Sequence, residues 1–373
     1  MTYIDNTKPN INVDSQQNER IITQKVERQS GLELLRIIAM IIIILYHFVI
    51  YSKIDLYSAE LVFSSKILRN GGKLGVNIFI LISAYFMVNK KFKWTRILNI
   101  VIQTFFYSVL FYLIFLSLGR AEFNISSILP VFMPISYMEY TFVTLYVMLM
   151  FLSPLLNLFI KKIGKKVHGI ICIVLSCVIV LFPYFNMIVL GRASEFPFVN
   201  TLVWFVVLYL IAGYIRLYVK SVSQNQKVWL YLLLVVFVTL QMVYTIYIDF
   251  RESCYEQALG NTIISIILLL IFKDFKFKNR FINTVASTTF GIFLIHENPY
   301  IRGWWWNFLV NTFSNFIKNY VLLALTLTLI TFIMFSIIDY IRLKTIHRLT
   351  QNLLNKIDKK IETHSNISNK QKE

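Results

Sequence analysis

The residues of this chain that could do chemistry inside a membrane are Arg36 and His47, which lie on one apolar stretch. Ionisable side chains in a bilayer are costly, so they are the first places to look for function. Eleven residues separate the two, and eleven steps of about 100° return to within about 20° of the starting direction. Both side chains therefore project from one helix face, about 16 Å apart along its axis. The spacing suits an elongated ligand with an anionic end at the guanidinium and a reactive end at the imidazole.

Structural interpretations of these residues stay open beside the chemical one. Arg36 can be a snorkelling residue that only sets membrane orientation, and a histidine in an apolar helix often serves as an interhelical hydrogen-bonding group. Glu33 lies one turn before Arg36 and could pair with it. His296 lies near the outer end of a later apolar segment, at a depth like that of His47. It could assist proton transfer or contribute a structural hydrogen bond.

Glycines and cations flank the start of the second apolar segment. Gly71, Gly72 and Gly75 allow a close approach of backbone to a ligand or a neighbouring helix, or form a flexible entry turn. Arg69 and Lys73 border the same segment on its outer side, where they could meet a charged ligand or remain solvated loop charges. We leave both alternatives open for each residue.

Aromatic and hydroxyl groups give weaker signals. Trp304, Trp305 and Trp306 fall in the connection before the last apolar segment. They could stack on sugars, but the stronger expectation is an aromatic belt at the membrane interface. Ser83 is polar inside an apolar segment, yet no base lies near it in sequence, so we propose no serine nucleophile.

Composition excludes a soluble enzyme and a disordered chain. Of 373 residues, 57% are hydrophobic and 15% are charged, whereas soluble domains are about half apolar and a quarter charged. The apolar runs are continuous rather than alternating, which favours spanning helices over a β-barrel. Three cysteines are too few for a disulfide framework. We therefore predict an all-α integral membrane protein, with no metal site.

Ten apolar segments are predicted to be membrane spans, since about 17 to 25 residues cross a hydrocarbon core of about 30 Å. Two of them, 74–89 and 258–272, are shorter, and we expect them to be tilted or partly interfacial. The predicted spans are 34–51, 74–89, 95–118, 140–160, 168–190, 200–219, 228–248, 258–272, 284–300 and 319–341. Every second connection between them is rich in Lys and Arg. Because these residues concentrate in cytoplasmic loops, we expect both termini to be cytoplasmic.

The net charge of +18 follows from these basic loops, which contact anionic lipid headgroups. We therefore expect membrane lipid as a partner and no nucleic acid. Three regions are expected: a polar cytoplasmic segment at 1–30, a membrane domain at 31–341 and a basic cytoplasmic tail at 342–373. The polar start predicts no cleaved signal peptide, so the first span would direct insertion.

Several sequence runs carry a family resemblance. GLELLRIIAMIIIILYH at 31–47 resembles the opening signature of the membrane acyltransferase-3 family, in which ten residues separate an Arg from a His. GGKLGVNIFILISAYFMV at 71–88 is similar to the family's glycine-rich second segment, which usually ends in Ser-Gly-Phe rather than Ser-Ala-Tyr. Weaker echoes are TFVTLYVMLMFLSPLLN at 141–157, WFVVLYLIAGYI at 204–215 and TFGIFLIH at 289–296.

The resemblance implies an O-acyltransferase of the bacterial plasma membrane. Such an enzyme moves an acyl group, usually acetyl, from cytoplasmic acyl-CoA to a hydroxyl of a cell-surface or lipid-linked polysaccharide, as in capsule or exopolysaccharide biosynthesis. It implies a catalytic role for His47, assisted by His296, and an acyl-CoA site at Arg36, with Glu33, Gly72 and Gly75 beside it. Acetyl-CoA is then a substrate, and no permanently bound cofactor is expected. Some relatives add a soluble hydrolase-like domain; if the final transfer needs such a domain, we expect a separate protein to supply it.

Two other functions compete with this one. A transporter or flippase for a lipid-linked sugar would also need many spans and outer aromatic residues, although few acidic residues lie in the spans and no inverted repeat is visible. A purely scaffolding membrane subunit would tolerate replacement of His47.

Overall fold

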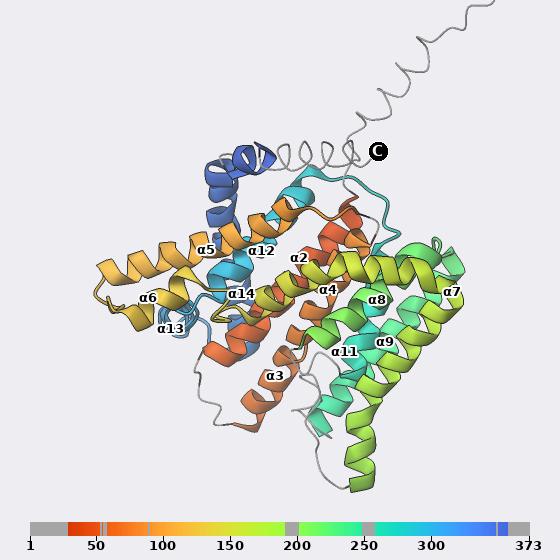
Figure 1. Cartoon of the computed structure of the whole chain (residues 1–373). Helices are drawn as coiled ribbons and strands as arrows, with labels where there is room; N and C mark the ends of the chain where they lie inside the picture. The colour runs from red at the N-terminus through yellow and green to blue at the C-terminus, as the bar shows by residue number, and fades with distance from the viewer. Residues whose placement is uncertain are drawn as a thin grey trace, which may run out of the picture.

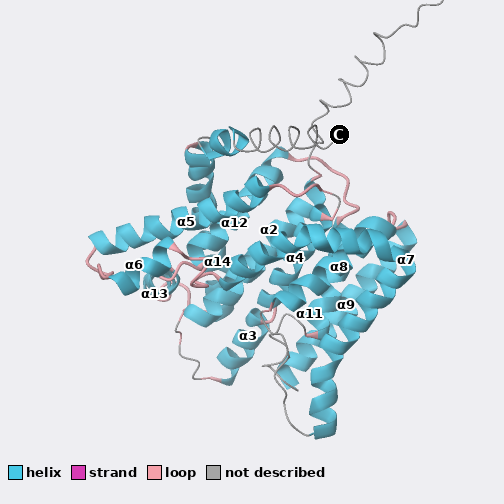
Figure 2. Cartoon of the chain, in the orientation of Figure 1, coloured by secondary structure: helices cyan, strands magenta, loops and turns pink. Residues whose placement is uncertain are grey.

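In the computed structural model, the described residues form helices joined by turns and loops, without a β-strand among them (Figure 2). The described residues are 29–52, 54, 58–88, 90–190, 201–247, 258–347 and 350–356. Most of the predicted segment 1–30 and the last part of the tail 342–373 lie outside them.

Every apolar segment predicted from the sequence falls on a helix. These helices are α2 (Ser30–Tyr51), α4 (Gly72–Met87), α5 (Trp94–Ser117), α7 (Thr141–Leu190), α8 (Leu202–Tyr218), α9 (Gln224–Tyr247), α11 (Leu259–Phe272), α12 (Arg280–His296) and α14 (Tyr320–Lys344). The predicted spans 140–160 and 168–190 share α7, which kinks at Gly164. Its φ of 69° is one that glycine adopts without strain.

Length and hydropathy mark the chain as a multi-pass membrane protein. Among the described residues, five helical segments are long and apolar enough to cross a membrane, and α8 and α11 are shorter apolar helices. The five are Ser30–Tyr51, Trp94–Ser117, Thr141–Leu181, Gln224–Tyr247 and Tyr320–Lys344. Ten spans and cytoplasmic termini remain predictions.

Three short helices lie in connections where the sequence predicted none: α3 (Ala59–Arg69), α6 (Ile125–Phe132) and α13 (Arg302–Phe313). Side-chain caps mark the start of two of them. Ser58 accepts a hydrogen bond from the Leu61 backbone amide, and Asn124 accepts one from the Ser127 amide. Such caps satisfy amides that a helix start leaves without partners.

Helix α2 runs through the middle of the bundle and packs against α4, α12 and α14 (Figure 1). Its contact with α4 depends on glycine. A Cβ at Gly75 would lie 2.8 Å from the Ala39 carbonyl oxygen, and one at Gly72 would lie 2.1 Å from the Tyr46 ring. Small residues let helices approach closely in lipid, where van der Waals packing holds them together.

A buried polar network ties α5 and α14 together beside α12. Asp339 is fully buried and accepts hydrogen bonds from Tyr107 Oη at 2.7 Å and from Arg342 Nε at 2.6 Å. A Cβ at Gly291 of α12 would lie 2.0 Å from the Asp339 carboxyl carbon. The acidic side chain therefore fills the space that glycine leaves on α12.

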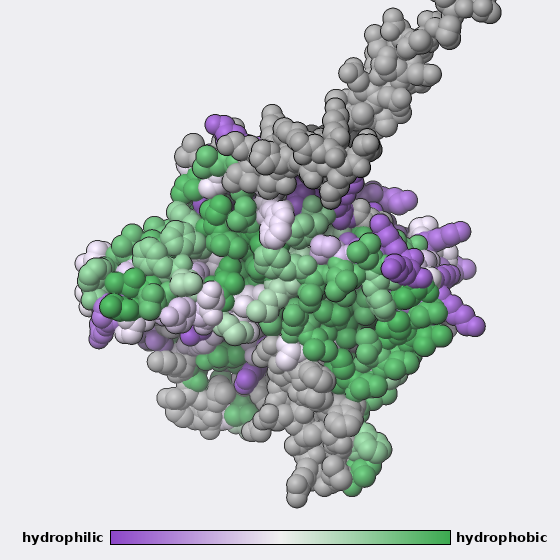
Figure 3. Space-filling view, in the orientation of Figure 1, coloured by the Kyte–Doolittle hydropathy of each residue, from purple (hydrophilic) through white to green (hydrophobic). Residues whose placement is uncertain are grey.

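On the face of the molecule shown in Figure 3, hydrophilic side chains are unevenly distributed. In Figure 3 the strongly hydrophilic side chains lie mainly at the upper right, near the α7 kink, above a broad apolar surface. Lys161, Lys162, Lys165 and Lys166 are exposed around that kink. The sequence predicts that this lysine-rich connection is cytoplasmic, because Lys and Arg concentrate in cytoplasmic loops.

Candidate active site

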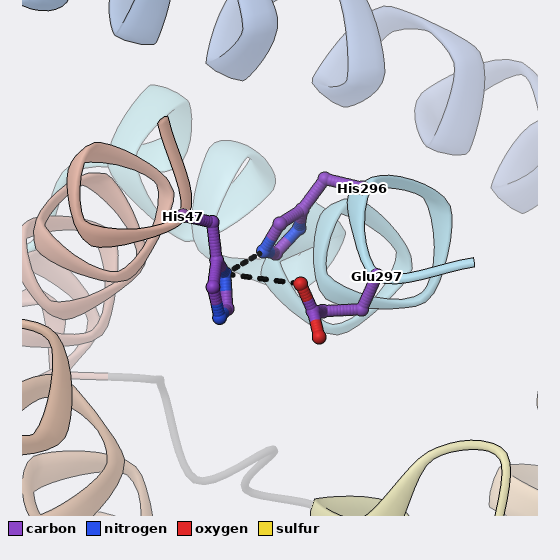
Figure 4. Close-up of side chains that lie close together, drawn as sticks. All are labelled: His47, His296 and Glu297. Atoms are coloured by element: carbon purple, nitrogen blue, oxygen red, sulfur yellow. Dashed lines mark hydrogen bonds and ion pairs between the residues drawn. The ribbon is translucent and has the colours of Figure 1, made fainter. Parts of the chain in front are cut away.

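Two histidines and a glutamate from distant parts of the chain meet where α2 and α12 end. His47 lies in the last turns of α2, His296 is the last residue of α12, and Glu297 follows it. His47 Nδ1 lies 2.9 Å from His296 Nε2 and 3.2 Å from Glu297 Oε1 (Figure 4). The structure therefore brings together the two histidines that the sequence predicted separately.

The hydrogen bonds fix the proton positions on both rings. His296 Nδ1 lies 2.7 Å from the Ile292 carbonyl oxygen, and because a carbonyl only accepts, this nitrogen carries the proton. His296 Nε2 is then an acceptor, so His47 Nδ1 donates to it. In a neutral ring, His47 Nε2 therefore has a free lone pair. It lies on the edge of the ring away from both partners (Figure 4).

Glu297 is held in a charged and aromatic setting. Its side chain hydrogen-bonds Tyr51, and Arg302 and Lys73 act on it electrostatically. The Tyr51 ring stacks on that of His47, with centroids 5.6 Å apart. Glu297 Oε1 is buried and has no hydrogen-bond partner among the described residues. A carboxylate so close to His47 stabilises the imidazolium that forms when the ring gains a proton.

His47 and Glu297 line a pocket of about 170 Å³. Residues of α2, α4, α7, α8 and α12, with Arg302 of α13, form its walls, and Gly72 and Lys73 belong to them. His296 is fully buried and lies outside the lining. A molecule in the pocket therefore meets His47, while His296 acts through His47.

Arg36 and Glu33 form an ion pair on α2, as their spacing predicted. Arg36 does not line the pocket. It acts electrostatically on Tyr146 of α7, whose hydroxyl group hydrogen-bonds Ser83 of α4. Arg36 and His47 thus lie in two separate polar environments: Arg36 near Glu33 and Tyr146, and His47 at the pocket. Apolar residues of α2 separate them.

The structure shows what surrounds the glycines and the two cations at the start of α4. Gly71, Gly72 and Gly75 lie against α2 side chains, so they serve close helix packing rather than a flexible turn. Gly72 and Lys73 also line the pocket. Arg69 does not line the pocket, but its guanidinium lies 5.8 Å from the ring centroid of Tyr46, which does.

The tryptophan expectation is only partly met. Trp305 and Trp306 are buried, whereas Trp304 is 39% exposed. Trp305 Nε1 donates to Thr331, and Trp306 packs edge-on against Phe48. Two of the three rings therefore belong to the core between α2, α13 and α14, because helix α13 turns them inward.

Sequence reasoning missed Glu297, Arg302 and Tyr51. Glu297 was recognisable, since it lies inside the predicted span 284–300 and follows a histidine. An acidic residue there is costly unless it has a partner or a function. Arg302 and Tyr51 gave no comparable signal, because their roles depend on contacts between distant segments.

The same three groups could hold a metal ion, since their donor atoms lie within 4.8 Å of one another. The two nitrogens are at N–H···N hydrogen-bond distance, so a shared proton accounts for their position. A zinc ion would need lone pairs from both nitrogens at about 2.0–2.1 Å. We therefore assign this contact to a proton, and the absence of a metal remains a prediction.

The sequence of the chain matches a known protein family. A model of an acyltransferase domain, Acyl_transf_3, matches residues 29–339. The chain belongs to the membrane acyltransferase-3 family. The match begins just before α2 and ends at Asp339, so it covers the whole candidate site. This acyltransferase matched none of the curated proteins and none of the solved structures that were compared. Family membership makes it an O-acyltransferase.

Proposed function

We propose that this acyltransferase transfers an acetyl group from cytoplasmic acyl-CoA to a hydroxyl of a cell-surface or lipid-linked polysaccharide in the bacterial plasma membrane. The observation that carries the proposal is the hydrogen-bonded pair of His47 and His296, with the lone pair of His47 Nε2 free beside a pocket. An imidazole with a free lone pair and an oriented second nitrogen is what a general base requires.

His47 takes the proton of the acceptor hydroxyl as the oxygen attacks the thioester carbonyl. The C–S bond then breaks, and the CoA thiolate leaves and receives a proton from His47. During this exchange His47 is an imidazolium, which His296 Nε2 and the Glu297 carboxylate stabilise. Alternatively, His47 Nε2 attacks the thioester carbonyl, and the C–S bond breaks as the CoA thiolate leaves. The acceptor hydroxyl oxygen then attacks the acyl-imidazole, the C–N bond breaks, and the proton of the hydroxyl goes to the CoA thiolate. His296 is a positioning residue in both routes.

Arg36 holds a CoA phosphate in this proposal, and its pair with Glu33 keeps the guanidinium oriented. The distance of about 16 Å between Arg36 and His47 along the helix leaves room for the pantetheine arm. Gly72 and Gly75 contribute by letting α4 approach α2 closely.

Radiolabelled acetyl-CoA tests the proposal. The purified full-length protein is incubated with the donor and with a glycan extract from a strain that lacks the protein. Label should move from CoA to glycan, and His47→Ala should slow the transfer by about 10²- to 10⁴-fold. A transporter or flippase would leave the thioester intact. Label retained on the protein when acceptor is omitted would favour the covalent route.

A further inference from the structure

The pocket beside His47 changes character with depth. On each of four helices, or directly after it, a polar lining residue lies about one turn, or about 5.4 Å, from an apolar one nearer the bundle middle. The pairs are His47 and Ile43 on α2, Lys73 and Val76 on α4, Thr141 and Leu145 on α7, and Phe293 on α12 with Glu297 directly after that helix. The pocket therefore has a polar rim and an apolar floor, and His47 belongs to the rim directly above the floor.

Three phenylalanine rings close the floor. Phe142 of α7 contacts Phe205 of α8, with ring centroids 5.8 Å apart, and Phe293 of α12, with centroids 5.2 Å apart. All three line the pocket, and Phe205 and Phe293 are buried. Deeper on α7, the Tyr146 ring stacks on Phe142. The floor is thus a rigid aromatic surface, because aromatic side chains packed from three helices cannot retract independently.

We propose that the apolar floor is the subsite for the acyl group, and that Phe142, Phe205 and Phe293 limit it to short acyl chains. This inference rests on the proposed function. Of the two reacting molecules, the sugar is polar and suits the rim, whereas the acyl chain gains free energy only where apolar surface covers it. The pocket of about 170 Å³ is smaller than the roughly 300–1,000 Å³ of ordinary small-molecule sites. It must admit both partners at His47, so little length remains for the chain.

Phe142 is the ring to change, because it is only half-buried and contacts both others. Phe142→Ala should create space for two further methylene groups. Each methylene that becomes buried is worth about fourfold in specificity, from about 0.8 kcal/mol. The ratio of kcat/KM for butyryl-CoA to that for acetyl-CoA should therefore rise about fifteenfold. Phe106→Ala is the matched control, since Phe106 is half-buried on α5 and lies outside the pocket. Its ratio should equal that of the parent.

Transfer of each labelled acyl group to the glycan extract is measured for the parent and the variants, per monodisperse protein. If Phe142→Ala does not fold, Phe142→Leu carries the test, with an expected rise of about fourfold for propionyl-CoA over acetyl-CoA. A variant that is active but keeps the parent's ratio would overturn the subsite alone. So would an equal rise in Phe106→Ala. A parent that consumes no acyl-CoA would overturn the proposed function, and the subsite with it.

Discussion

Replacing His296 with alanine removes the group that accepts the His47 Nδ1 proton. The two nitrogens lie 2.9 Å apart, and His296 is fully buried. The remaining imidazole keeps its lone pair but loses the partner that sets its tautomer and orientation. Glu297 Oε1, 3.2 Å from the same nitrogen, is the group that can take over this hydrogen bond.

The expected loss follows from these contacts. Losing the partner of one buried hydrogen bond costs about 1–3 kcal/mol, which corresponds to about five- to 150-fold in rate. Because Glu297 substitutes in part, we expect His296→Ala to lower kcat about tenfold and to change KM little. His47→Ala removes the base itself and should cost about 10²- to 10⁴-fold. The double variant His296→Ala/Glu297→Gln should fall well below His296→Ala.

The measurement is transfer of labelled acetyl groups at saturating donor, per amount of folded protein. His168→Ala is the matched control, since His168 is also fully buried and hydrogen-bonds a backbone carbonyl, that of Leu210, away from the pocket. It should retain the kcat of the parent. The positioning role of His296 is refuted if His296→Ala stays within twofold of the parent, or if it loses as much as His47→Ala.

Four further outcomes are expected. Arg36→Lys keeps the positive charge but loses the planar guanidinium, so half-saturation by acetyl-CoA should rise about tenfold, or about 1.4 kcal/mol; an unchanged value would move the donor site elsewhere. Gly75→Ala should lower the unfolding temperature in detergent through about 1–3 kcal/mol of overpacking, whereas Gly303→Ala, with open space at its Cβ, should not. Cysteine labelling at Lys162→Cys should succeed only from the cytoplasmic side, and external labelling would contradict the predicted topology. Treatment with a chelator should leave acetyl transfer unchanged, and a loss restored by zinc would assign the histidine pair to a metal.

Hydropathy was sufficient to locate the long helices, because a bilayer demands long apolar runs and little else produces them. The positions of α2, α9 and α14 follow directly from it. The sequence did not predict the short helices α3, α6 and α13, because none of them is long enough to give an apolar run of span length. The sequence separated the spans 140–160 and 168–190 at a run of lysines, and between these spans the structure interrupts the helical geometry of α7 at Gly164.

The site was predictable residue by residue but not as a constellation. The position of His47 on its helix and the depth of His296 were readable from two separate segments. Their contact joins residues 249 positions apart, and periodicity within one helix carries no information about such a pairing. Glu297 could have been predicted as a site residue, because an acidic side chain within an apolar span is costly in free energy unless it has a partner or a function. Tyr51 and Arg302 could not be predicted as site residues, because their contacts with Glu297 depend on how α2 and α13 pack.

The fit of Asp339 against Gly291 has a consequence for His296, five residues further along α12. Apolar helices in lipid have no preferred sliding position, because one leucine surface resembles the next. The Asp339 carboxylate fits only opposite Gly291, where no side chain occupies the space, so it fixes the register of α12 against α14. This contact also fixes the rotation of α12 about its own axis. The direction of the His296 side chain, about 7.5 Å further along the helix, is set by that rotation. One inserted residue between the two would turn the imidazole by about 100°, away from His47, without changing any residue of the site.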